Sequence, residues 1–288
     1  GARDIQDYIG QVPGIVLQEG QYGDAGSRKI TIRGVGPSEV ATVSGNQTVG
    51  QFIGDIPMTD PYSNFVTPDL DPFDLETVEI LKGPQGTYFG ASALNGAIRY
   101  VPNKPELGHW SSRGFVERQV VRYGGAGQTY AGAVNTPLGD TMAFRASGVL
   151  QHSPGLIDNL RRDTEDADSR RKWSGRGALR WQPAERFDLT GMFLKQQARK
   201  NDLLDVDNND EQFTNNSHAG PSRMTTGFQL ASIDARYEFD DWGTVIFQSS
   251  RQEKSVDADV DAPLLLGSQG VREFRAYQST KVSGSTNE

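Results

Sequence analysis

The 288-residue sequence contains no cysteine and only three histidines, His109, His152 and His218. Without thiols, the chain cannot form a disulfide framework, an iron–sulfur cluster, a thiolate zinc site or a cysteine nucleophile. The histidines are far apart in the sequence, so a histidine triad or a histidine metal site lacks its other members. The motifs G-x-S-x-G, H-E-x-x-H and G-K-S/T are missing as well. We therefore expect a protein that is not an enzyme and that has no cofactor.

Basic residues and long apolar runs are also scarce. The chain has 29 Lys and Arg against 37 Asp and Glu, so 29 − 37 gives a net charge of −8. Because binding to phosphates requires a basic surface, this composition argues against a nucleic-acid partner. No run approaches the roughly 18 consecutive apolar residues of a transmembrane helix. A transmembrane β-barrel stays open, because each of its strands needs an apolar residue only at every second position.

The first part of the chain, up to about residue 105, has short apolar runs separated by Gly, Pro and Asp. This pattern predicts a compact α+β domain. We expect an opening helix over residues 2–11, with apolar residues at spacings of three and four, and a second helix beginning at Asp71-Pro72. The four expected strands cover residues 14–17, 29–33, 49–53 and 77–82, and the glycine-rich residues 83–96 are expected to form a loop.

The second part, after about residue 110, alternates apolar and polar residues over long segments. The pattern is clearest in residues 142–150, 175–181, 187–194 and 231–239. These segments are longer than an ordinary strand of about five or six residues, and they suit strands that cross a bilayer at a tilt. One face is apolar, and the other has charged residues that we expect to face inward: Arg145, Arg176, Arg180, Asp188, Asp234, Arg236 and Glu238.

The connections between these segments alternate in length. Short turns are expected at residues 136–140, 182–186 and 240–243, and long polar loops at 152–173, 198–225 and 253–269. Such alternation is typical of an up-and-down barrel, and we count about eight strands, from residues 112–123 to 271–282. Aromatic residues beside the short turns suit a membrane-interface girdle, although aromatic pairs also occur across the strands of soluble β-sandwiches. They are Trp181, Phe187, Tyr237, Phe239 and Trp242.

The two parts impose a geometric constraint on each other. An eight-stranded barrel is filled by its own side chains, whereas a barrel of about 22 strands can enclose a plug. A first domain of about a hundred residues therefore either lies outside the barrel or belongs to a larger barrel of which this chain is a part.

Four sequence blocks decide between these alternatives by resemblance. They are DYIGQVPGI (7–15), ITIRGVG (30–36), VGQFIGDIPM (49–58) and LDPFDLETVEILKGPQGTYFGASALNGAIRYVPNKP (70–105). In this order they resemble the plug domain of TonB-dependent outer-membrane receptors. The resemblance implies a plug over residues 1–106. It implies that residues 107–288 are the N-terminal portion, about eight strands, of an incomplete 22-stranded transmembrane antiparallel β-barrel.

The same resemblance implies energised uptake of a scarce solute across the outer membrane of a Gram-negative bacterium. The expected partners are the TonB energy-transducing complex, outer-membrane lipid and lipopolysaccharide, and a small-molecule substrate: a siderophore, haem, cobalamin or an oligosaccharide. Because such a plug must be displaceable, we expect a polar and wet contact between plug and barrel rather than an apolar core. Two other functions stay open, a soluble β-rich carbohydrate-binding or hydrolytic module and a passive porin.

Several residues take candidate roles from this resemblance. The family uses basic plug residues, here Arg33 and Lys82, to pair with carboxylates of the barrel wall, although many members have Arg at the position of Lys82. Lysine keeps the charge but loses the bidentate geometry of a guanidinium. The candidate ligand contacts are apical aromatic residues that can stack on a chelate and one loop histidine suited to haem: Tyr62, Tyr88, Phe89 and His218.

An acidic run in one long loop resembles the start of a calcium loop. Asp205, Asp207 and Asn209 place oxygen atoms at alternate positions. However, the glycine and the final carboxylate of such a loop are missing, and Asn216 stands where the carboxylate belongs. These residues are a weak calcium candidate, and a plain solvated loop is the alternative. A second acidic patch, around residues 163–168, is interleaved with arginines and suits contact with lipopolysaccharide or with a ligand.

Overall fold

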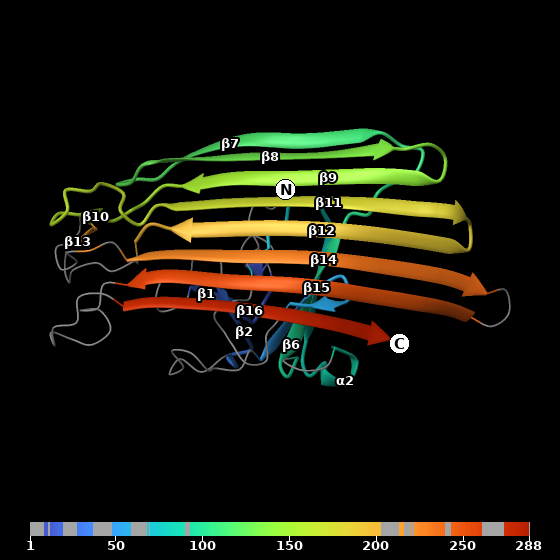
Figure 1. Cartoon of the computed structure of the whole chain (residues 1–288). Coiled ribbons are helices and arrows are strands. Elements are labelled where there is room, and N and C mark those ends of the chain that lie inside the picture. Colours follow the sequence, from blue (N-terminus) through green and yellow to red (C-terminus); the bar gives the residue numbers. More distant parts are fainter. Residues whose placement is uncertain are drawn as a thin grey trace.

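The computed structural model describes residues 9–10, 12–19, 28–36, 48–58, 68, 70–89, 93–202, 213–215, 220, 222–239, 243–260 and 274–287. Two parts are evident in Figure 1: a broad sheet of long strands, and a group of short strands that lies against one face of that sheet. We call the broad sheet the wall and the smaller part the plug. Within the described residues, no helix has both the length and the apolar character needed to cross a membrane.

The wall is an eight-stranded sheet. Each of its strands is hydrogen-bonded to the wall strand that precedes it and to the one that follows it in the sequence. The strand order is β16-β15-β14-β12-β11-β9-β8-β7, and every pair is antiparallel. This is the up-and-down order predicted from the sequence. The strands are β7 (Ser111–Val120), β8 (Ala126–Pro137), β9 (Met142–Ser153), β11 (Arg170–Ala184), β12 (Phe187–Lys200), β14 (Arg223–Phe239), β15 (Gly243–Val260) and β16 (Phe274–Asn287).

The two faces of the wall differ as the alternation predicts. Large apolar side chains on the face away from the plug are exposed, for example Leu150 at 60%, Phe193 at 50% and Ile233 at 51%. Arg145, one of the charged residues expected to face inward, is only 7% exposed. Because an exposed apolar face is costly in water and favourable in lipid, this distribution favours a membrane-spanning sheet over a soluble sandwich.

The two ends of the wall also differ. Tight turns follow β8 and β11 at one end, on the right in Figure 1, where β14 also ends, whereas β9, β12 and β15 end on the left. Aromatic pairs lie at the end with the tight turns: the Trp181 and Phe187 ring centroids are 5.8 Å apart, and those of Tyr237 and Phe239 are 4.6 Å apart. β10 (Asp158–Asn159) pairs in parallel with β13 (Thr214–Asn215).

The plug contains two small sheets. β1 (Ile15–Glu19) pairs with β2 (Arg28–Ile32), and a four-stranded sheet has the order β4-β3-β6-β5. Its strands are β3 (Val49–Ile53), β4 (Ile56–Pro57), β5 (Leu75–Lys82) and β6 (Gly96–Pro102), with the short helix α2 (Gly86–Phe89) between the last two. The positions of β1, β2, β3 and β5 agree with the prediction to within two residues. Of the expected opening helix, only the last residues lie in the described part.

Two local predictions for the plug are wrong. Asp71-Pro72 does not begin a helix: the Phe73 amide donates to the Asp71 side chain at 2.9 Å, and the chain turns directly into β5. Asp followed by Pro starts both helices and such turns, so the dipeptide did not distinguish them. The loop expected over residues 83–96 from its four glycines contains the helix α2, and its last residue, Gly96, begins β6. The φ of +155° at Gly96 and its close approach to the Leu81 carbonyl oxygen leave no room for a side chain.

The core of the plug extends into the wall. Ile32, Val49, Ile98 and other plug residues form one buried apolar cluster that also contains wall residues. The wall contributes Leu194 from β12 and Phe228 and Leu230 from β14. The expectation of a polar and wet contact rather than an apolar core is therefore wrong in part, because the contact between plug and wall includes a shared apolar core.

Candidate functional site

The strongest polar contact between plug and wall centres on Asp74, in the turn that leads into β5. Asp74 has a positive φ of 63°, and its carboxyl group has no exposed surface. A non-glycine residue with positive φ is uncommon, although Asp tolerates it better than most residues. Its main-chain oxygen accepts a hydrogen bond from the Asn103 amide at 3.2 Å, and the Asn103 side chain also reaches the carboxylate at 3.3 Å. The turn thus presents the carboxylate to the wall.

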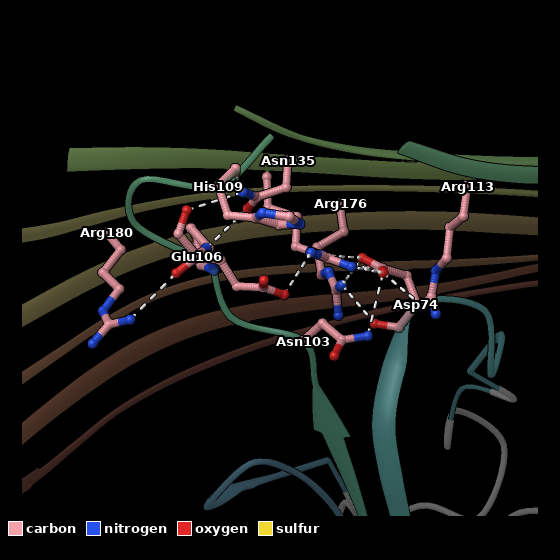
Figure 2. A network of polar contacts seen from close by, with 10 residues as sticks. Asp74, Asn103, Glu106, His109, Arg113, Asn135, Arg176 and Arg180 are labelled. Carbon is pink, nitrogen blue, oxygen red and sulfur yellow. Dashed lines mark hydrogen bonds and ion pairs between the residues drawn. The ribbon is translucent and has the colours of Figure 1, made fainter. Parts of the chain in front are cut away.

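Three wall arginines from three strands converge on this carboxylate (Figure 2). Arg145 of β9 donates from Nε at 2.9 Å to Oδ2 and from Nη2 at 2.5 Å to Oδ1. Arg176 of β11 donates from Nη2 to Oδ2 at 2.5 Å and to the Asp74 main-chain oxygen at 2.8 Å. Arg113 of β7 donates to Oδ1 at 2.6 Å. We call Asp74 with these three arginines the Asp74 cluster.

The electrostatics of the cluster keep Asp74 ionised. Burial alone would raise the pKa of the Asp74 carboxyl, but the hydrogen bond from Arg145 and the charges of Arg176, Arg145 and Arg113 outweigh burial. The pKa of Asp74 therefore lies below its ordinary value. Removing one partner of such a buried pair costs about 3–5 kcal/mol, because it leaves uncompensated charge behind. The cluster is therefore a specific attachment point for the plug.

The segment that joins plug and wall is attached beside the cluster. The Asn135 side chain accepts from the Glu106 amide at 2.9 Å and donates to the main-chain oxygens of Glu106 and His109 at 3.0 and 2.6 Å. Arg180 donates to the Pro105 oxygen at 3.4 Å and pairs with Asp188 at 2.6 Å. These contacts, drawn in part in Figure 2, fix the chain as it leaves the plug and enters β7.

A second polar contact joins the plug to the other side of the wall. On β15, Gln252 donates to the Pro57 oxygen at 2.7 Å, and Lys254 donates to the Met58 oxygen. Both side chains are buried, Lys254 with 2% of its surface exposed. Because these bonds end on main-chain oxygens, they depend on the path of the plug backbone rather than on its side chains. The plug is thus attached at β4 as well as at β5.

The seam between plug and wall is not completely filled. A cavity of about 30 Å³ lies beside the Asp74 cluster and is lined by Phe73 and Leu75 of the plug and by Ser147, Arg176 and Gln196 of the wall, among others. This is room for about two water molecules. Its lining is partly polar, as the sequence-based expectation of a wet contact requires.

The structure places the predicted anchoring residues Arg33 and Lys82 away from the Asp74 cluster. Lys82 Nζ donates to the Pro13 oxygen at 2.8 Å, a contact within the plug, and the Arg33 amide donates to the Gly14 oxygen at 2.6 Å. In the described part of the chain, neither forms an ion pair with a wall carboxylate. Their pairing with the wall stays a prediction. The ion pairs that join Asp74 to the wall have the opposite polarity, with the carboxylate on the plug and the cations on the wall.

The predicted ligand contacts are only partly within the described residues. Phe89, in α2, is half-buried, and its ring lies 4.7 Å from that of Phe52. Tyr88 belongs to the same helix, but its side chain lies outside the described part. The other candidates, Tyr62, His218 and the calcium residues Asp205, Asp207 and Asn209, are outside it as well.

The second acidic patch has a structural role. Asp168 accepts hydrogen bonds from the Leu156 and Ile157 amides at 2.7 and 2.8 Å, and Asp166 accepts one from the Gly125 amide at 3.0 Å. The bond between Gly125 and Asp166 joins the loop between β7 and β8 to the segment between β9 and β11. These carboxylates therefore hold the loops together, and the expectation that they face a ligand or lipopolysaccharide applies at most to their exposed neighbours, such as Glu165.

The geometry and the comparisons with known proteins point to the same class, a plug domain seated against one face of an antiparallel sheet of long strands. Residues 1–97 match the family model of the TonB-dependent receptor plug domain. The predicted resemblance is therefore confirmed: the N-terminal third of the chain is similar to the plug domains of TonB-dependent receptors.

Curated relatives and solved structures extend the similarity into the wall. The chain is 29% identical over 161 residues to the ferrienterobactin receptor of Escherichia coli, covering 52% of this chain and 21% of the relative. It is 25% identical over 214 residues to the ferric enterobactin receptor PirA of Pseudomonas aeruginosa, covering 67% and 28%. The ferric yersiniabactin uptake receptor FyuA of Yersinia pestis has a similar fold, with a TM-score of 0.74 at 19% identity over 90% of this chain and 39% of that structure. The chain thus spans less than a third of the length of either curated relative.

Proposed function

We propose that this chain is part of an outer-membrane TonB-dependent transporter that takes up an iron–siderophore chelate. The observation that carries this proposal is the plug seated on the polar face of the wall through the Asp74 cluster, while the other face exposes large apolar side chains. The named relatives are siderophore receptors, which favours an iron chelate over haem, cobalamin or an oligosaccharide. A passive pore has no need of a plug attached at two places.

The finer organisation belongs to the same proposal. Residues 1–106 act as the plug, and residues 107–288 supply the first strands of a 22-stranded barrel in the outer membrane of a Gram-negative bacterium. The TonB complex pulls on the plug, because an outer membrane has no ATP and the work has to arrive mechanically. Tyr62, Tyr88, Phe89 and His218 are proposed contacts of the bound chelate or of the loops around it.

Uptake of labelled iron tests this function. Cells that express the full-length receptor are given radiolabelled ferric siderophores of several chemical classes, with and without an intact TonB complex. We expect uptake of at least one chelate that disappears without TonB, while binding of that chelate to the cell surface persists. Recovery of the receptor in the soluble periplasm, or uptake that does not depend on TonB, would contradict the proposal.

A further inference from the structure

The Asp74 cluster has more positive than negative charge. Three guanidinium groups surround the Asp74 carboxylate, and the next carboxylate, Glu106, is 3.7 Å from Arg145 Nη1. Three positive and two negative charges leave a net charge of +1. Arg145 and Arg176 have only 8% and 7% of their side-chain surface exposed, so solvent compensates this excess poorly.

The positive and negative charges belong to different parts of the molecule. Arg113, Arg145 and Arg176 lie on β7, β9 and β11 of the wall. β9 pairs directly with β11, and β8 joins β9 to β7. Arg113 and Arg176 lie in one row across the wall, through the paired positions Ala133 and Ser147. Asp74 belongs to the plug, and Glu106 belongs to the segment that joins plug and wall. If the plug moves, the arginines stay on the wall, whereas Asp74 leaves with the plug.

From this arrangement we infer that Arg113, Arg145 and Arg176 form an anion-binding site on the wall, which the Asp74 carboxylate occupies at rest. When Asp74 is withdrawn, an incoming anion with carboxylate, catecholate or phosphate oxygens takes its place. The Arg145 and Arg176 side chains are buried, whereas that of Arg113 is 48% exposed. Two buried guanidinium groups without a carboxylate partner are unfavourable, and the forked donors of all three arginines match such oxygens well. The inference rests on the proposed function, because it requires a plug that moves for an anionic cargo.

Two further observations place room and an incompletely used donor at this site. The cavity of about 30 Å³ has Arg176 in its lining, so the site borders a space that is already open. In addition, Arg145 Nη1 is buried and makes no hydrogen bond within the described residues; its one described partner is Glu106, at the ion-pair distance of 3.7 Å. A ligand larger than the Asp74 carboxylate thus finds a donor that has no hydrogen bond at rest.

Binding of citrate to the purified full-length receptor tests the site directly. Calorimetric titration compares the wild type with Asp74→Ala, in which the carboxylate is removed while the three arginines stay. We expect Asp74→Ala to bind citrate about tenfold more tightly than the wild type, and the addition of Arg176→Gln to reverse this gain. Asp188→Ala is the matched control, because it removes a wall carboxylate that pairs with Arg180, and we expect it to create no citrate site.

The outcomes separate this inference from the proposed function. Asp74→Asn provides a second variant of nearly native shape, and circular dichroism establishes that each variant is folded. Equal citrate binding by wild type, Asp74→Ala and Asp74→Asn would overturn the inference. The inference would also fail if the double variant Asp74→Ala/Arg176→Gln bound citrate as tightly as Asp74→Ala. If Asp74→Ala gains citrate binding but the wild type transports no ferric chelate, the site stands and the proposed function fails.

Uptake measurements provide a second test in the receptor with Asp74 intact. In Arg176→Gln, we expect the maximal uptake rate of an anionic ferric triscatecholate to fall about tenfold more than that of a neutral ferric trihydroxamate, where both are substrates. Binding of either chelate to unenergised cells should stay unchanged, because the site is closed at rest. An equal loss for both chelates, or a loss of binding, would contradict the inference.

Discussion

A single carboxylate connects the plug to three strands of the wall. Asp74 is fully buried and accepts hydrogen bonds from Arg113, Arg145 and Arg176. A buried ion pair is often no more stable than a well-packed apolar contact of the same size. The advantage of the ion pairs here is specificity. The guanidinium groups of three arginines donate hydrogen bonds with a fixed geometry, so they favour one position of the carboxylate.

Replacing Asp74 by Asn should loosen the plug. The amide keeps the shape of the side chain but removes the charge, and it leaves three guanidinium groups without a buried carboxylate partner. We expect a loss of about 3–5 kcal/mol in the attachment of the plug, measured as greater permeability of cells to antibiotics too large for porins. Asp140→Asn, on an exposed tight turn, is the control and should change nothing. Permeability equal to the wild type in Asp74→Asn would show that the cluster does not hold the plug.

The same carboxylate should make the attachment sensitive to acid. Because the pKa of Asp74 is below its ordinary value of 3.8, the folded protein binds this proton more weakly than the unfolded chain does. The contribution to stability is fully present above the ordinary value and is lost as the pH falls through the lower, folded-state pKa. We expect hydrogen exchange of β5 amides in the full-length receptor to increase in that acid range. In Asp74→Asn, the increase should be absent.

The strands of the wall illustrate which elements can be predicted from sequence. Their alternation is strong because each residue faces either the exposed apolar side of the wall or the plug side, and period two can be read directly from the chain. The plug gives weaker signals: Asp71-Pro72 begins a turn instead of a helix, and Gly96 begins a strand instead of lying in a loop. At Asp71-Pro72, the local hydrogen bond from the Phe73 amide to the Asp71 side chain accompanies the turn. At Gly96, pairing with the distant residues Val49 and Lys82 outweighs local preference.

The Asp74 cluster was only half predictable. The alternation places Arg145 and Arg176 on the inner face, but it does not identify what they contact, because Asp74 lies 71 and 102 residues away in the sequence. The resemblance to the receptor family suggested basic plug residues, so the opposite polarity became apparent only from the geometry. The one feature of the local sequence that indicates the cluster is Asp74 itself. It is an acidic residue two positions after Pro72, in a turn, and Asp tolerates a positive φ there.

The apolar face of the wall should tolerate no charge near the middle of a strand. Phe193 lies in the middle of β12 and is 50% exposed on the outer face. We expect Phe193→Lys to destabilise the receptor in lipid by about 2–4 kcal/mol, measured by urea unfolding in bilayers. Ser232→Lys is the control, because it introduces the same charge at a position of β14 that faces the plug. Equal effects of both substitutions would contradict a lipid-facing outer surface.

At the scale of the whole molecule, two kinds of contact seat the plug on the wall. An apolar core is shared through Leu194, Phe228 and Leu230, while polar contacts lie at β5, beside a cavity, and at β4. If the plug is pulled as proposed, water can replace the polar partners one by one as the seam opens. The shared apolar core would then set most of the remaining resistance.

Removing the plug should convert the full-length receptor from an energised transporter into an open pore. Deletion of residues 1–106 removes Asp74 and the plug side of the shared core, and exposes the arginines of the wall to a water-filled lumen. We expect uptake to lose its dependence on the TonB complex. We also expect cells to become permeable to large antibiotics, and more so than cells with Asp74→Asn. The deletion variant must first reach the outer membrane in amounts equal to the wild type. If its uptake of ferric chelate still required the TonB complex, the plug would not be the element that TonB moves, because the barrel alone would respond to the applied force.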